Sequence, residues 1–394
     1  MSRLWDKGLP LDARILRYTA GEDHMLDARL VHYDVLGSIA HVEMLAATGL
    51  INGVDSASIC AGLRRLDADF AAGKWSIRIE DEDAHTALES RLVENIGSAG
   101  ARMHLGRSRN DQVLTALRLY LRDVATDLTQ RVEALRASLR GVAERQGTIP
   151  LPGYTHMQQA MPSSVALWCG GFDEAFVDIV AGLQSVRRRI NKNPLGSAAG
   201  YGTPGLPIDR NLTAQKLGFD VTQQPVTAVQ LSRGKAESAL LFEITLLVQD
   251  LGRMASDLLL FYTQEFSYIA LPAEVTTGSS IMPQKRNPDV LELIRAAAAT
   301  TQACLDESLL ITAKLPSGYQ RDLQRLKAPL FRGIDLGIES VDIMAYVLDG
   351  MRFIAENIRL DPGIYAAEEA NRIVREEGIP FRDAYRRIAE RFVK

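Results

Sequence analysis

One long apolar stripe constrains this chain more than any other feature of its sequence. Apolar side chains recur at intervals of three or four residues from Val113 to Val142. That spacing is typical of one face of an α-helix, so the stretch predicts a single helix of about 35 residues, roughly 50 Å long. Because such a helix needs cover for its apolar face, the chain must supply long partner helices.

Four further stretches have the same helical spacing. They are Met161–Ile190, Val226–Phe266, Pro288–Thr312 and Ala328–Leu348. Residues 193–210, rich in glycine and proline, predict an irregular crossover between the first two. Since alternating strand patterns are almost absent, we predict an all-α fold, a long-helix bundle with small helical N- and C-terminal domains.

Shorter amphipathic segments flank the predicted bundle. We predict an N-terminal helical domain over residues 1–103, a central long-helix bundle domain over 104–351 and a short C-terminal helical domain over 352–394, which ends on a helix at Phe381–Phe392. In the first domain, Ala84, Leu88 and Leu92 form one face of a helix. The acidic run Glu80–Asp83 loads the first turn of that helix, and complementarity with the helix dipole explains the run without a function.

The composition argues against several functional classes. The formal net charge is −4, whereas a nucleic-acid partner requires a basic excess or stripe. Cys60, Cys169 and Cys304 are far apart and lack the spacing of metal ligands. The N-terminus has no apolar signal-peptide core, and no apolar run reaches the ~18 residues of a membrane span. We therefore expect a cytoplasmic protein with reduced thiols, without a nucleic-acid or membrane partner.

The most unusual polar stretch reads GSSIMPQKRNPD, from Gly278 to Asp289. Asn287 can cap the helix that follows, and Pro288 suits its first position. A helix N-terminus beside Lys285 and Arg286 favours a carboxylate or phosphate, and Ser279 adds a hydroxyl on the same loop. On the chemistry of this segment alone, a capped helix behind a surface loop is the favoured explanation of these residues.

Three other polar stretches interrupt the apolar pattern. HLGRSRNDQV precedes the longest helix, and either Ser108 or Asn110 can cap it. The arginines of this stretch are either solvated or, with Asn110 at a helix N-terminus, a receptor for a dicarboxylate.

The remaining two stretches are LPGYTHMQQAMP and SGYQRDLQRLKAP. In the former, His156 lies on a Pro/Gly turn, where hydrogen-bonding neighbours can hold a proton carrier of near-neutral pKa. In the latter, Tyr319, Gln324 and Lys327 either line a polar site or belong to a solvated turn.

These stretches resemble motifs of a known enzyme family. GSSIMPQKRNP is similar to the signature loop of the fumarase/aspartase superfamily, while GRSRNDQV, PGYTHMQ and Y-x-x-DLQ-x-x-K indicate its argininosuccinate lyase branch. The resemblance implies a carbon–nitrogen lyase that splits argininosuccinate into arginine and fumarate, the last step of arginine biosynthesis. It also implies a homotetramer with active sites assembled from three subunits, and neither a metal nor an organic cofactor.

The resemblance also suggests a role for individual residues. Ser279 is the expected base, activated by Lys285 and loop N–H groups, and His156 is the expected acid, oriented by Glu292. Lys285 and Asn287 would bind the substrate carboxylates. The other residues that match substrate-binding positions of the family are Asn110, Thr155, Tyr319, Gln324 and Lys327, with Arg109 and His85 as additions from the same motifs.

Three departures from the family pattern bear on the substrate. Asp23 stands where relatives have a serine, and its carboxylate would favour a cation such as the substrate's α-amino group. Of an S-D-R-D-type segment only Arg233 is kept, and the C-terminal region is short. Two alternatives therefore stay open: a fumarate-releasing lyase for another N-substituted aspartate, and a non-catalytic relative.

Overall fold

The computed structural model describes residues 12–392, so the N-terminal segment examined for a signal peptide lies outside the described residues apart from its end. The chain forms two compact units, each built from three stretches. The first unit comprises Met1–Thr129, Ala181–Thr245 and Ala299–Leu336, and the second comprises Gln130–Val180, Leu246–Ala298 and Gly337–Lys394. The predicted domain boundaries at residues 103 and 351 stay predictions.

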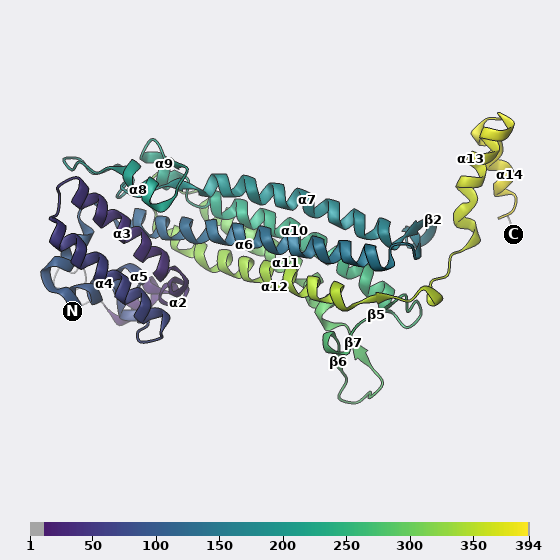
Figure 1. The fold of residues 1–394 in the computed structure, drawn as a ribbon, viewed down its shortest axis with the longest axis horizontal. Helices are drawn as coiled ribbons and strands as arrows, with labels where there is room; N and C mark the ends of the chain where they lie inside the picture. The colour runs from purple at the N-terminus through teal and green to yellow at the C-terminus, as the bar shows by residue number, and fades with distance from the viewer. Residues whose placement is uncertain (1–11, 393–394) are drawn as a thin grey trace. The chain divides into compact units, whose positions relative to one another are not determined.

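Five long helices dominate the fold, which confirms the all-α prediction (Figure 1). They are α6 (Arg109–Gln146), α7 (Val165–Ile190), α10 (Lys235–Tyr262), α11 (Asp289–Thr312) and α12 (Lys327–Gly350). Each contributes residues to both units. The stripe that predicted α6 is buried along its length, from Leu117 to Val142.

Contacts within each unit show how the long helices pack. In the second unit, Arg136 of α6 donates to Asp173 of α7 at 2.8 Å, and Trp168 of α7 donates to Asp257 of α10 at 3.0 Å. In the first unit, Gly333 of α12 allows the close approach of Leu241 of α10, because a Cβ at that position would overlap the leucine side chain. The long helices therefore pack against one another in both units.

One of the predicted helices begins later in the structure than in the sequence pattern. Met161–Ser164 belong to strand β2 (Gln158–Ser164), which pairs antiparallel with β1 (Pro150–Thr155), and α7 starts at Val165. Pro162 explains the difference, because the residue before a proline is driven from helical to extended geometry. The predicted start at Met161 was wrong.

The predicted helix Val226–Phe266 is two helices in the structure. α9 (Thr227–Leu231) ends before Gly234, and α10 ends at Tyr262. Gly234 has a φ of 82°, and a Cβ there would overlap Thr312 Cγ2. Such a backbone position suits glycine and interrupts a helix, although the apolar periodicity continues through it.

Shorter elements complete the chain. The N-terminal helices are α1 (Ala13–Ala20), α2 (Asp23–Leu26), α3 (Val31–Ala47), α4 (Gly53–Ala71) and α5 (Ala84–Ile96); the later ones are α8 (Arg210–Leu217), α13 (Ala366–Glu377) and α14 (Phe381–Ala389). The 3₁₀ turns are η1 (Asp27–Leu30), η2 (Ile79–Asp81), η3 (Gly97–His104), η4 (Ala273–Val275), η5 (Arg321–Leu326), η6 (Ala355–Asn357) and η7 (Pro362–Tyr365). Ala84, Leu88 and Leu92 are fully buried, as their spacing in α5 predicted.

The remaining strands form three small sheets of two strands each. β3 (Lys192–Asn193) pairs parallel with β4 (Val221–Thr222), β5 (Ile269–Ala270) antiparallel with β8 (Arg352–Phe353), and β6 (Thr277–Gly278) antiparallel with β7 (Arg286–Asn287). The pair β6–β7 holds the two ends of the GSSIMPQKRNPD loop together.

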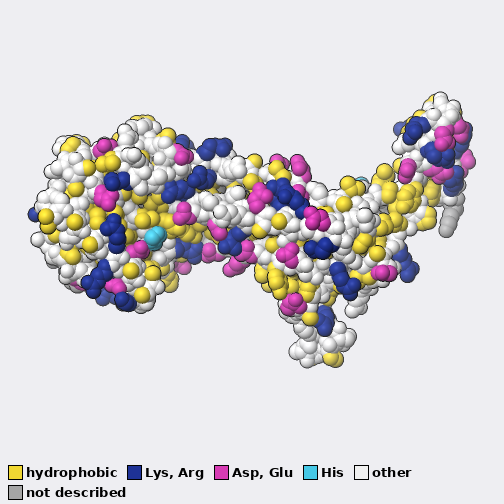
Figure 2. Space-filling view, viewed as in Figure 1, with side chains coloured by type: hydrophobic (Ala, Val, Ile, Leu, Met, Phe, Trp, Pro, Cys, Tyr) yellow, Lys and Arg dark blue, Asp and Glu magenta, His cyan; other side chains and the backbone are white. Residues whose placement is uncertain are grey.

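The surface carries mixed charge. On the face shown in Figure 2, Lys and Arg side chains lie among Asp and Glu side chains rather than in a continuous basic stripe. Within the described residues, no helix is both long and apolar enough to cross a membrane.

Candidate active site

A polar cavity of about 170 Å³ lies in the first unit. Seven residues singled out in the sequence line it, although they come from distant parts of the chain: Asp23, His85, Arg109, Asn110, Tyr319, Gln324 and Lys327. The cavity also contains residues that the sequence reading did not single out as site residues, among them Asp27, Glu82 and Asp83.

Lys327 is buried between two carboxylates. Its Nζ lies 3.0 Å from Asp23 Oδ2 and 2.5 Å from Asp27 Oδ1. Burial raises the pKa of Asp23 to about 6, and the charge of Asp27 adds to this effect while Lys327 opposes it. Burial lowers the pKa of Lys327, but the two carboxylates outweigh it and raise that pKa overall. The cluster therefore contains a buried ammonium and a carboxyl group that titrates near pH 6.

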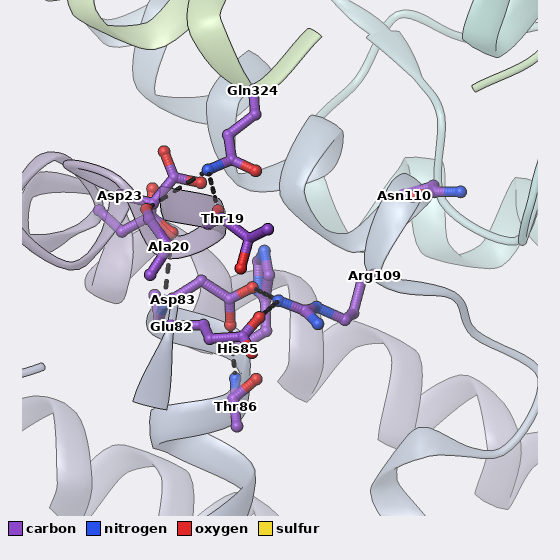
Figure 3. A network of polar contacts seen from close by, with 12 residues as sticks. Thr19, Ala20, Asp23, Glu82, Asp83, His85, Thr86, Arg109, Asn110 and Gln324 are labelled. Atoms are coloured by element: carbon purple, nitrogen blue, oxygen red, sulfur yellow. Dashed lines mark hydrogen bonds and ion pairs between the residues drawn. The ribbon is translucent and has the colours of Figure 1, made fainter. Parts of the chain in front are cut away.

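Glu82 and Asp83 line the cavity, just before the N-terminus of α5. Asp83 caps α5, because its side chain accepts from Thr86 N at 2.9 Å, and it also pairs with Arg109 (Figure 3). Burial would raise the pKa of Asp83, yet the nearby charges of His85 and Arg109 hold it down at about 2. Glu82 is buried at a φ of 66°. Asp83 at the N-cap agrees with the dipole interpretation of this run, but Glu82 and Asp83 also line the cavity, which that interpretation did not anticipate.

His85 is a buried histidine with one ring nitrogen in use. Its Nδ1 lies 2.5 Å from Asp34 Oδ2, while its Nε2 is buried without a hydrogen-bond partner. Burial lowers the pKa of His85, but Asp34 and the further charges of Asp83 and Asp27 raise it overall. Asp34 therefore favours the charged form of the ring, and Nε2 is the ring nitrogen left without a hydrogen-bond partner beside the cavity.

The first turn of α6 and the segment around η5 complete the cavity. Ser108 caps α6, since its Oγ accepts from Asn110 N at 3.3 Å, which resolves the alternative between Ser108 and Asn110. Gln324 Nε2 donates to Thr19 O at 2.9 Å and so ties η5 to the end of α1.

The remaining sequence-derived site residues belong to the second unit: Thr155, His156, Ser279, Lys285, Asn287 and Glu292. His156 lies at the exposed turn of the β1–β2 hairpin, where His156 and Met157 have φ values of 51° and 59°. Thr155 ends β1 and is also exposed.

The loop between β6 and β7 presents Ser279 to backbone donors. Ser279 Oγ accepts from Met282 N at 3.2 Å and from Ile281 N at 3.4 Å, and the Lys285 side chain is exposed on the same loop. The prediction that Asn287 caps the following helix was wrong, because its side-chain amide donates to Gly278 O at 3.4 Å. Pro288 O accepts from Leu291 N, so α11 begins at Asp289, with Glu292 exposed in its first turn.

The cavity residues that the sequence analysis did not predict lie close in sequence to predicted ones. Glu82 and Asp83 directly precede His85, and Asp27 follows Asp23 by one helical turn. Within residues 12–392, no group of three or more His, Cys, Asp and Glu side chains is arranged to hold a metal ion.

Comparisons with known proteins agree with one another. A family profile described as "Lyase" matches residues 13–302. The argininosuccinate lyase of Sorangium cellulosum is 43% identical over 389 residues, which cover 98% of this chain and 90% of the relative. The argininosuccinate lyase of Thermotoga neapolitana is 40% identical over 399 residues, covering 99% and 98% of the two chains.

Solved structures share the fold. EDDS lyase in complex with formate matches with a TM-score of 0.82 at 27% identity, covering 97% of this chain and 76% of that one. The class II fumarase of Schistosoma mansoni matches with a TM-score of 0.80 at 18% identity, covering 98% and 90%, and this second likeness shows the fold alone.

Proposed function

The chain belongs to the argininosuccinate lyase family, and we infer that it eliminates fumarate from argininosuccinate to leave arginine. The observation that carries this function is the near-complete match to argininosuccinate lyases at 40% identity or more. The structure adds a charged cavity, which is lined by the seven candidate site residues from distant parts of the chain.

The reaction removes a proton from a carbon next to a carboxylate and then breaks the bond from the neighbouring carbon to the guanidinium nitrogen. That proton is weakly acidic, because the carbanion must spread its charge onto the carboxylate and form a dianion. Preorganised hydrogen-bond donors and cations supply the stabilisation such a species needs. The residues assigned below are proposed for these tasks.

Ser279 is the proposed base. A serine hydroxyl is a weak base unless its alkoxide is stabilised. The contacts of Ser279 Oγ with the N–H groups of Met282 and Ile281 support such stabilisation, as does the positive charge of Lys285 on the same loop. Lys285 and Asn287 would also bind the succinyl carboxylates.

His156 is the proposed acid that protonates the departing nitrogen. Glu292 would orient the imidazole and stabilise its charged form, in the manner of a carboxylate–imidazole pair. Thr155, next to His156 at the end of β1, would bind the substrate. The exposure of these side chains leaves them accessible to a substrate or to another subunit.

The cavity in the first unit is the proposed receptor for the arginine end of the substrate. Asp23 would bind the α-amino group, while Arg109, Asn110, Tyr319, Gln324 and Lys327 would complete the receptor. The carboxylates of Asp23 and Asp27 neutralise Lys327, so its ammonium does not repel a cationic ligand.

A homotetramer with active sites shared between subunits is part of the proposal. Large apolar side chains stay exposed on the long helices of the single chain, among them Leu167 of α7, Phe242 of α10, Leu293 and Leu310 of α11 and Tyr346 of α12. Helices with such exposed side chains are suited to pack against further helices. We also propose a cytoplasmic location, where the three buried free cysteines would stay reduced.

The test is a direct assay of fumarate absorbance with purified protein. Argininosuccinate, adenylosuccinate and aspartate are offered separately, and we expect fumarate only, or far faster, from argininosuccinate. A lyase for another N-substituted aspartate is the second candidate, favoured by the likeness to EDDS lyase. Preference for a different succinyl compound would support that candidate, and a folded tetramer inactive on all of them would indicate a non-catalytic relative.

A further inference from the structure

Most charged side chains around the cavity already have a partner of opposite charge. Lys327 pairs with Asp23 and Asp27, Arg109 with Asp83, and Arg321 with Glu82. Arg233 lines the same cavity, but it has no carboxylate partner within hydrogen-bond distance.

Arg233 is a buried guanidinium with unused donors. Its side chain is 3% exposed, and neither Nε nor Nη1 has a hydrogen-bond partner. The nearest carboxylate is that of Glu237, with Oε1 at 4.0 Å from Nε, beyond hydrogen-bond distance. The guanidinium carbon lies 6.0 Å from the ring centre of Tyr319, which also lines the cavity.

The charges around Arg233 do not balance. Arg118 is buried in the same cluster and donates to Lys192 O, Gln223 Oε1 and Ser232 Oγ, all uncharged acceptors. Burial lowers the pKa of Arg118 to about 10, with Glu237 opposing this effect and Arg233 adding to it. Two guanidiniums thus share one carboxylate, and a buried excess of one positive charge is costly unless an anion offsets it.

We propose that Arg233 binds the α-carboxylate of the arginine portion of the substrate. The proposal rests on the function inferred above and names a receptor for one end of that substrate. A guanidinium fork matches a carboxylate with two parallel N–H donors, and Arg233 has unused donors beside the cavity.

The other charges of the cavity select this carboxylate among the three of argininosuccinate. An amino-acid end bears an ammonium and a carboxylate on the same carbon, so its receptor needs an acidic and a basic group around one cavity. Asp23 and Arg233 provide that combination. The two succinyl carboxylates are assigned to Lys285 and Asn287, on the loop that carries the proposed base.

The experiment compares arginine with agmatine, which is arginine without its α-carboxylate. Calorimetry measures the binding of both compounds to wild-type protein and to Arg233→Gln, independently of turnover. We expect wild-type protein to bind arginine at least about tenfold more tightly than agmatine, as for a charge-assisted hydrogen bond, and the variant to lose most of this preference. Affinity for fumarate should change little.

Arg118→Gln is the matched control, because it removes the other guanidinium of the cluster. It should lower the thermal midpoint and leave the preference for arginine intact. If Arg233→Gln does not fold, Arg233→Lys keeps a charge beside Glu237 and should retain only part of the preference, since an ammonium lacks the planar fork.

Three results would overturn the proposal. They are a wild-type protein that does not distinguish the two compounds, an unchanged preference in the Arg233 variants, and a loss of fumarate affinity in place of arginine affinity. The fumarate-release assay on wild-type protein is separate, so its failure would contradict the proposed function without being mistaken for a failure of Arg233.

Discussion

Lys327 and its two carboxylates show how a residue's surroundings set its chemistry. A lone buried ammonium would be unstable, but the carboxylates of Asp23 and Asp27 hold it charged. Burial, helped by the charge of Asp27, raises the pKa of Asp23 to about 6. Ser279 has the opposite setting, since it lies on a surface loop among backbone donors.

Asp23→Asn tests the titrating carboxyl. Above pH 6 the wild-type carboxyl is ionised and attracts the substrate ammonium; as pH falls through about 6 it becomes neutral, so KM should rise. The variant should show a KM raised about tenfold at pH 8 and little further change on acidification. The measurement is KM against pH from 5 to 8.

Glu22→Gln is the control for this profile, because Glu22 is an exposed neighbouring carboxylate. It should reproduce the wild-type profile. An identical acid rise in KM for Asp23→Asn and the wild type would assign the titration to another group.

Ser279→Ala tests the base. Removing the hydroxyl should lower kcat by about 10²–10⁴-fold, which is the typical effect of lost acid–base catalysis. Arginine binding should stay close to that of the wild type. Stopped assays of fumarate release and calorimetry with arginine measure the two quantities. Ser280→Ala removes the adjacent hydroxyl and should keep most of the activity; near-normal kcat in Ser279→Ala would refute the assignment.

At the scale of elements, helix ends and turns place the candidate site residues. The break between α9 and α10 puts Arg233 in a turn beside the cavity instead of on a continuous helix. The β6–β7 pair closes the base of the Ser279 loop, and the turn between β1 and β2 carries His156. The long helices position these ends and supply few of the candidate groups themselves.

Gly234→Ala tests the α9–α10 break. A Cβ at a φ of 82° is strained and would overlap Thr312 Cγ2, so we expect a loss of about 1–3 kcal/mol of stability. Thermal unfolding would show it as a lower midpoint. Gly53→Ala is the control, because no atom lies within 4 Å of the added Cβ, and it should change stability by no more than ~0.5 kcal/mol.

At the scale of the whole molecule, the candidate residues divide between the two compact units. The cavity residues belong to the first unit, while His156, Ser279 and their proposed helpers belong to the second. The proposed tetramer would bring such groups together from different chains.

A mixing experiment tests that arrangement. Ser279→Ala and His156→Asn should each be nearly inactive alone. If the serine and the histidine of one site come from different subunits, unfolding and refolding the two variants together should restore roughly a quarter of the wild-type activity, because each residue is intact in about half of the chains. No recovery in tetramers shown to contain both variants would place both residues on the same subunit.

The sequence by itself determined the all-α bundle and the position of its polar interruptions. Helical periodicity is a local property, and the apolar stripe from Val113 to Val142 records which face of α6 is buried. The motifs also identified the family, since they preserve the residues of a particular chemistry in order along the chain.

Only the tertiary structure decided which polar residues meet and where a periodic pattern is interrupted. Apolar spacing continues through Gly234, but the approach of Thr312 requires the break there. The sequence did not mark Asp27 or Asp83 as site residues, and it marked Arg233 only as the arginine kept from a family segment. All three become site candidates because folding buries them around one cavity. Burial and the proximity of charges depend on contacts between distant segments, and a linear pattern does not contain them.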